Sequence, residues 1–184
     1  AQLYNATKLS GRTKKGLGIG LFNAVTAAQQ AEAYNMDTEL NRSVVVSPLT
    51  NYNVFVLDQN LKNNSSVTFT NTNVLRNGSA YDANVTGLNS KFNTKDNKYF
   101  IQSRTALSNK LRSVGNELGY NLGTTIGRQT GNWIYHLDYF EESDTYDPND
   151  LGFNTNNNKR KFAIPDTWNI YGEYRFSLRV GSLH

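Results

Sequence analysis

The sequence predicts an all-β, antiparallel fold and, within that class, a transmembrane β-barrel of about ten strands. Three observations lead to this prediction. The stretch 168–180 alternates apolar and polar residues for longer than a typical strand of a soluble sheet. The expected connections alternate between short turns and longer loops. Tyr and Trp stand near the expected strand ends, as in interfacial aromatic girdles or, alternatively, in a half-buried core.

Composition narrows the class further. The chain has 184 residues and no Cys, which excludes disulfides and thiol chemistry, and we expect one domain over 1–184. No run approaches the ~20 apolar residues of a membrane-spanning helix, but barrel strands alternate and score as polar overall. The net charge is +4, but the basic residues are scattered, so we expect no nucleic-acid partner.

The expected strands follow from alternating residues between turn signals. They are 3–12, 17–26, 51–60, 66–75, 81–92, 99–108, 119–128, 132–140, 159–164 and 168–180. We expect long loops near 27–48, 109–118 and 141–158. Residues 27–33 could form a short helix inside the first of these loops, and the spacing of Leu107, Leu111, Val114 and Leu118 makes a short helix compete with a loop at 109–118.

The expected strand 168–180 divides into two faces. In a barrel we expect one face to meet lipid and the other to line the lumen. The lipid-facing residues would be Trp168, Ile170, Phe176 and Leu178, and the lumen-facing residues Glu173, Arg175 and Arg179.

The strand 132–140 carries the one histidine–carboxylate pair of the sequence. His136 and Asp138 share a face, which we expect to line the lumen, with Trp133 and Tyr135 facing lipid. Such a pair is the minimum for general-base catalysis. No nucleophile can be placed beside it from the sequence, so we expect no catalytic residues. His184 is the only other histidine, so we expect no multi-histidine metal site.

The loop after this strand is acidic and rich in amides. Asp144, Asp147, Asn149 and Asp150 are its candidate binding residues, and an irregular calcium site within 141–150 is one interpretation. The spacing does not fit an EF-hand. The structural interpretation is an Asx-type turn at Asp147-Pro148-Asn149-Asp150, in a loop that folds over the mouth of the barrel. We expect no other cofactor.

Four stretches carry a family resemblance: GLGIGLFNAVTA (16–27), LTNYNVFVLDQNLKNNS (49–65), GSAYDANVTG (78–87) and ESDTYDPNDLGF (142–153). They resemble a family of large Bacteroidetes outer-membrane proteins. In that family a β-sandwich similar to family 9 carbohydrate-binding modules precedes a barrel domain of unknown function. The resemblance implies a barrel or barrel segment in the outer membrane of a Gram-negative bacterium, with any carbohydrate bound through a domain absent here. No family string is found from Phe162 onward, so further strands are one expectation.

These observations favour a non-enzymatic outer-membrane β-barrel. It would be a transport or envelope-scaffold component in a larger chain or complex, with membrane lipid and other envelope proteins as partners. One alternative is a soluble carbohydrate-binding β-sandwich, in which aromatic side chains stack on sugar rings. The other is a barrel hydrolase that uses His136 and Asp138.

Overall fold

The computed structural model describes residues 2–36, 40–152, 154, 157–163 and 169–170. The described residues contain strands, turns and loops and no helix, and they therefore contain no helix that could cross a membrane. The strands are β1 (Leu3–Arg12), β2 (Leu17–Thr26), β3 (Gln29–Asn35), β4 (Leu40–Ser47), β5 (Thr50–Asn60), β6 (Ser66–Arg76), β7 (Asp82–Asn93), β8 (Tyr99–Arg112), β9 (Gly115–Arg128), β10 (Trp133–Glu142), β11 (Lys159–Ala163) and β12 (Asn169–Ile170).

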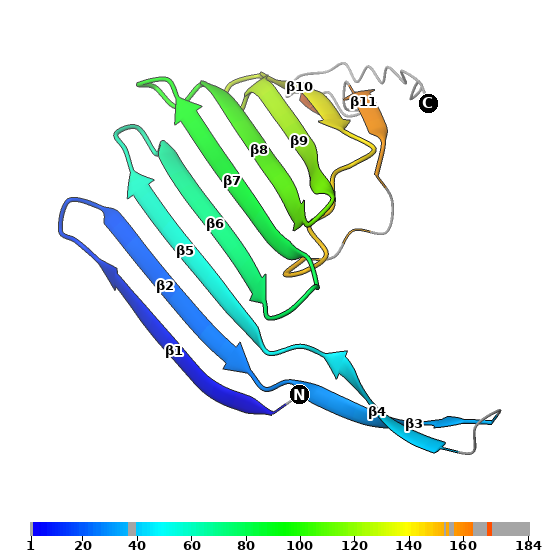
Figure 1. Ribbon diagram of the computed structural model, residues 1–184. Helices are drawn as coiled ribbons and strands as arrows, with labels where there is room; N and C mark the ends of the chain where they lie inside the picture. Colours follow the sequence, from blue (N-terminus) through cyan, green and yellow to red (C-terminus); the bar gives the residue numbers. More distant parts are fainter. Residues whose placement is uncertain (1, 37–39, 153, 155–156, 164–168, 171–184) are drawn as a thin grey trace.

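One large antiparallel sheet dominates the molecule (Figure 1). Its order is β1-β2-β5-β6-β7-β8-β9-β10-β11, and β12 pairs with β10. The predicted all-β antiparallel fold is therefore confirmed. A closed barrel is not found, because within the described residues β1 pairs only with β2, and β11 only with β10.

The two ends of this sheet differ in their connections. The turn end carries the short connections 13–16, 61–65, 94–98 and 129–132, and the loop end carries 27–49, 77–81, 113–114 and 143–158. Left-handed backbone at Gly16, Asn63, Asn64 and Asn97 closes three of the turns, as expected for Gly and Asn.

Two expectations for the loop end were wrong. The connection 27–48 contains a two-stranded ribbon, β3–β4, which extends away from the sheet, and not a short helix at 27–33 (Figure 1). The region 109–118 is the tip of the β8–β9 hairpin, with a turn at 113–114, and not a long loop or helix. Leu107 and Leu111 are four residues apart, a spacing that also places them on one face of a strand, so periodicity could not separate the alternatives.

The register divides the large sheet into an apolar face and a polar face. We define the apolar face as the one that carries Leu57 and the residues in register with it. Over β2 and β5–β11 of the large sheet it carries all the exposed large hydrophobic side chains of the strands except Phe22. These are Ile19, Leu21, Leu75, Leu88, Phe92, Tyr99, Ile101, Leu107, Leu111, Leu118, Tyr120, Ile126, Trp133, Tyr135, Leu137 and Phe162.

The polar face carries mostly Thr, Asn, Gln and charged side chains over β6–β10. It also carries the few fully buried side chains of the sheet, and these lie toward the loop end, among them Val74 and Ser108. The connection 143–158 packs there, since the Ser108 Oγ accepts a hydrogen bond from the Asp147 amide at 3.0 Å. No second sheet packs on either face within the described part of the chain, so nothing there supplies the second layer of a β-sandwich.

Candidate functional site

The polar face of β10 brings His136 and Asp138 together. The Nε2 atom of His136 lies 3.3 Å from the Oδ2 atom of Asp138, and both side chains are partly exposed. The Thr125 hydroxyl on β9 donates a 2.7 Å hydrogen bond to the other oxygen of Asp138. Trp133 and Tyr135, on the same strand, lie on the opposite, apolar face. The structure thus places these two pairs of residues on opposite faces of β10, as their alternation in the sequence predicts. That one pair faces lipid and the other the lumen of a barrel stays a prediction.

A hollow of about 460 Å³ lies on the polar face beside Asp138. Gln102 and Arg104 of β8, Asn121 of β9 and Phe140 of β10 contribute to its lining. No serine or threonine hydroxyl in the described part of the chain hydrogen-bonds to the His136 imidazole. The hollow therefore offers polar and cationic groups for binding, and the Thr125 hydroxyl that lines it donates to Asp138.

The acidic loop is held to the polar face by two ion pairs. Asp147 pairs with Lys110 of β8, and Asp150 pairs with Arg76 of β6. The Arg76–Asp150 side chains are only 16% and 8% exposed. The carboxylate oxygen Oδ1 of Asp147 also accepts the Asn149 amide at 2.9 Å, so the predicted Asx-type turn is confirmed.

Tyr81 lies at the centre of these contacts. Its ring has Arg76 at 4.6 Å, Lys110 at 5.3 Å and Arg112 at 5.7 Å from the ring centroid, all within cation–π range. Its hydroxyl donates to Asp150 at 3.2 Å. The cations come from β6 and β8, so the cluster joins two strands that are not adjacent and the loop that covers them.

Glu142 and Gly119 complete the attachment of the loop. Glu142 is 6% exposed, and its two carboxylate oxygens accept hydrogen bonds from Asn121 at 2.6 Å and from Asn154 at 3.0 Å. A Cβ atom on Gly119 would lie 2.3 Å from the Tyr146 Cα, so the loop backbone packs directly on β9 where a side chain is missing.

Burial and hydrogen bonding act in opposite directions on Asp147. Partial burial alone raises the pKa of its carboxyl. The hydrogen bonds from Lys110 and from the Asn149 amide, with the positive charge of Lys110, outweigh this effect and hold the pKa below its ordinary value of 3.8. The Asp147 carboxylate is thus stabilised in its charged form by the attachment of the loop.

The loop carboxylates therefore meet cations of the sheet. Among the described residues there is no group of three or more His, Cys, Asp or Glu side chains that could hold a metal ion. Of the four loop residues proposed for binding, Asn149 accepts the Asn154 amide at 2.6 Å, and Asp144 lines a hollow on the other side of the loop. Calcium binding stays a prediction for this loop.

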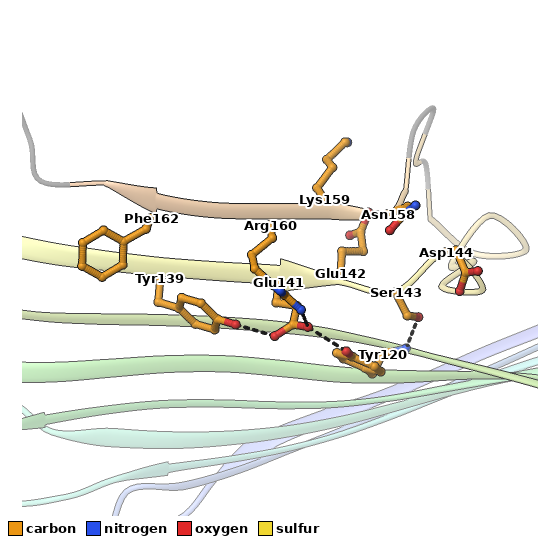
Figure 2. A pocket seen from close by; sticks show the side chains of 10 residues that line it. All are labelled: Tyr120, Tyr139, Glu141, Glu142, Ser143, Asp144, Asn158, Lys159, Arg160 and Phe162. Atoms are coloured by element: carbon orange, nitrogen blue, oxygen red, sulfur yellow. Dashed lines mark hydrogen bonds and ion pairs between the residues drawn. The ribbon is translucent and has the colours of Figure 1, made fainter. Parts of the chain in front are cut away.

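That second hollow, of about 770 Å³, lies beside the loop end of β9–β11 (Figure 2). On the apolar face there, the Glu141 carboxylate accepts hydrogen bonds from the hydroxyls of Tyr139 and Tyr120, the latter at 2.9 Å. Its oxygen Oε1 also pairs with Arg160 of β11 at 2.7 Å. Sequence reasoning missed this cluster, because only the pairing of β9, β10 and β11 brings its members together.

The remaining predicted residues are on the expected strand 168–180. Trp168, Glu173, Arg175, Phe176, Leu178 and Arg179 lie outside the described residues, and Ile170 is described only as part of β12. The cations of the loop cluster, Arg76, Lys110 and Arg112, were also missed. No spacing in the sequence relates them to Asp147 or Asp150.

The comparison with protein families identifies the chain. A model described as "Domain of unknown function (DUF5916)" matches residues 1–180. The chain belongs to this family. No curated protein and no solved structure matches the chain. The match supports the predicted domain of unknown function, and it says nothing of organism or location.

Proposed function

We propose that this DUF5916 domain forms part of the wall of a non-enzymatic outer-membrane β-barrel of a Gram-negative bacterium, of the Bacteroidetes by resemblance. It would serve transport or the envelope scaffold, within a larger chain or complex. The proposal rests on the one-sided apolar surface of the sheet and on the resemblance of the four sequence stretches.

The apolar face is the observation that carries the proposal. Side chains such as Leu88, Ile101 and Ile126 are 45%, 42% and 52% exposed, and they lie on the same face of successive strands. Soluble monomers rarely expose contiguous apolar patches larger than a few hundred Å². Lipid chains would cover such a face along its whole width, as they do in transmembrane barrels.

The polar face suits the lumen of such a barrel. Its residues hydrogen-bond across strands, as Thr68 does to Asp58 at 2.8 Å and Asn121 to Glu142 at 2.6 Å. The loop 143–158 would then lie inside the wall at the loop end and narrow the lumen there. The edges of β1 and β11 would be closed by strands outside the described residues, because unpaired edges are costly in lipid.

Membrane partitioning tests the proposal. The envelope is fractionated, and the protein is run in gels with and without heating. Recovery in the outer membrane with heat-dependent migration would support the barrel. A protein that is soluble without detergent and migrates identically in both gels would overturn it.

The His136–Asp138 contact at 3.3 Å favours one second candidate, a barrel hydrolase. The test is lipid and ester hydrolysis by the detergent-folded protein and by His136→Ala, with Ser10→Ala as a control distant along the sheet. Loss of a measurable activity only in His136→Ala would establish the hydrolase. Absent or equal activity in all three proteins would dismiss it.

A further inference from the structure

A row of four cross-strand partners crosses the polar face over β8–β11. The partners are, in order, Arg104, Gly123, Phe140 and Lys161. The two cations thus stand at the ends of the row, about 14 Å apart at the backbone by the spacing of strands. Between them Gly123 carries no side chain, and a Cβ atom there would find its nearest neighbour, a ring carbon of Phe140, at 3.7 Å. The sheet is therefore hollowed at Gly123, which is part of the floor of the hollow of about 460 Å³ beside Asp138.

The cations around this hollow lack the carboxylate partners that other cations of the polar face have. Four cations elsewhere on this face form ion pairs: Arg12, Arg76, Lys110 and Arg112. Within the described residues the structure shows no ion pair for Arg104, for Lys161 or for Lys91, which lies diagonally next to Arg104 on β7. Two more lysines without an ion pair, Lys8 and Lys159, lie on β1 and at the loop end of β11. Unneutralised positive charge is therefore gathered on both sides of the hollow.

The Arg104 guanidinium is oriented by a neighbour on its own strand. In the amide orientation that satisfies hydrogen bonding, the Gln102 oxygen accepts from the Nε atom of Arg104 at 3.2 Å and from its Nη2 atom at 3.0 Å. Among the described residues, the Nη1 atom has no hydrogen-bond acceptor. The edge formed by Nη1 and Nη2 is therefore available to a ligand, and a guanidinium edge matches the two oxygens of a carboxylate.

Asp138 carries the one carboxylate among the described residues that line the hollow. Its oxygens are already in contact with the Thr125 hydroxyl at 2.7 Å and the His136 imidazole at 3.3 Å. One cation thus faces one carboxylate across the hollow. A ligand with a single negative charge neutralises Arg104, whereas a second negative charge would lie against Asp138 and be repelled. The ring of Phe140 adds an apolar wall between the two groups, which suits the uncharged body of an organic anion.

We infer that this hollow binds a small organic carboxylate, with its carboxylate group on Arg104 and its body against Phe140. Lys91 and Lys161 attract such an anion toward the hollow by charge. In a barrel the hollow would face the lumen, where arginine and lysine side chains select anions. That location rests on the proposed function, and the inference adds the class of substrate.

Calorimetric titration with benzoate tests the site, because this probe combines one carboxylate with a flat ring. The folded protein is titrated in detergent if it partitions into membranes, and in buffer if it is soluble. Arg104→Gln removes the charge. Lys8→Gln is the matched control, since Lys8 is also a cation of the polar face without an ion pair, on the distant strand β1. Benzamide, the neutral analogue, and inorganic phosphate are titrated alongside.

We expect benzoate to bind the wild-type protein and Lys8→Gln with equal Kd. In Arg104→Gln the Kd should rise roughly tenfold to hundredfold, the effect of losing a hydrogen bond to a charged group. Benzamide and phosphate should bind more weakly than benzoate. Equal Kd values for benzoate in the wild-type protein and Arg104→Gln would overturn the inference, and so would tighter binding of phosphate or of benzamide.

Circular dichroism reports the folding of each variant. If Arg104→Gln does not fold, Gly123→Val repeats the measurement, because it fills the hollow and leaves Arg104 in place. Binding of benzoate to a protein that proves soluble would support the site and reject its location in a lumen. A membrane-embedded protein that does not bind benzoate would overturn the site and leave the barrel intact.

Discussion

The Arg76 guanidinium pairs with the Asp150 carboxylate, a residue 74 positions later in the chain, and both side chains are largely buried. This contact fixes a loop rich in acidic and amide side chains to one face of the sheet. The long connection 143–158 is thus ordered by an ion pair between two residues whose positions in the sequence give no sign that they meet.

Asp150→Asn tests this attachment. The substitution leaves the Arg76 charge without its carboxylate, and breaking a buried pair in this way costs about 3 kcal/mol. We expect faster amide hydrogen exchange over the loop 143–158. Asp144→Asn is the control, since Asp144 is in the same loop and the structure shows no ion pair for it. Equal exchange in the two variants would contradict a role for the Arg76–Asp150 pair.

Gly119 tests the close approach of the loop to β9. A Cβ atom at Gly119 would lie only 2.3 Å from the Tyr146 backbone. The substitution Gly119→Ala therefore forces the loop away from the strand. On the same face, a Cβ at Gly123 would meet the nearest atom of Phe140 at 3.7 Å, an ordinary contact. We expect proteolysis within the loop in Gly119→Ala and not in Gly123→Ala. Proteolysis of the loop in Gly123→Ala and not in Gly119→Ala would show that the close packing of the loop on Gly119 does not hold the loop in place.

Asp147 makes the attachment of the loop sensitive to acid. Because its pKa is lower in the folded protein than its ordinary value of 3.8, it contributes stability above that value and loses it as the pH falls through the lower, folded-state value. Protection of the Asp147 and Asn149 amides against exchange should persist at neutral pH and fall below pH 3.8. The Asn73 amide, within β6, serves as the reference. Loss of protection already near about pH 6 would point to another group.

Leu88 and Asn89 are neighbours on β7, both exposed, on the apolar and the polar face respectively. In water, arginine would be tolerated at either position. In a bilayer, Leu88→Arg near the midplane should cost about 2–4 kcal/mol, and Asn89→Arg should be near neutral. The measurement is the free energy of unfolding in urea from lipid vesicles. Equal tolerance of both substitutions would argue against lipid at the apolar face.

The local sequence pattern determined the strand faces and several of the turns of this protein. Alternation such as that of Trp133, Tyr135, His136 and Asp138 is read directly from the sequence, since successive side chains of a strand point to opposite faces. The turns at 13–16, 61–65 and 94–98 were predictable because Gly16, Asn64 and Asn97 favour left-handed backbone. At 109–118 neither the expected loop nor the competing helix is present, because a four-residue spacing such as that of Leu107 and Leu111 suits a helix and a strand equally.

Tertiary structure alone decided which residues meet across strands. Register sets Asn23 beside Asn53 and Glu141 beside Arg160, and the folded loop sets Asp150 beside Arg76. Register is a property of paired strands, and a shift by one residue would exchange the two faces. The sequence therefore determined the strands and their two faces. The cross-strand asparagine row from Asn23 to Asn109 and the ion pairs that hold the loop form only when these strands pair in order, because their members are far apart in the chain.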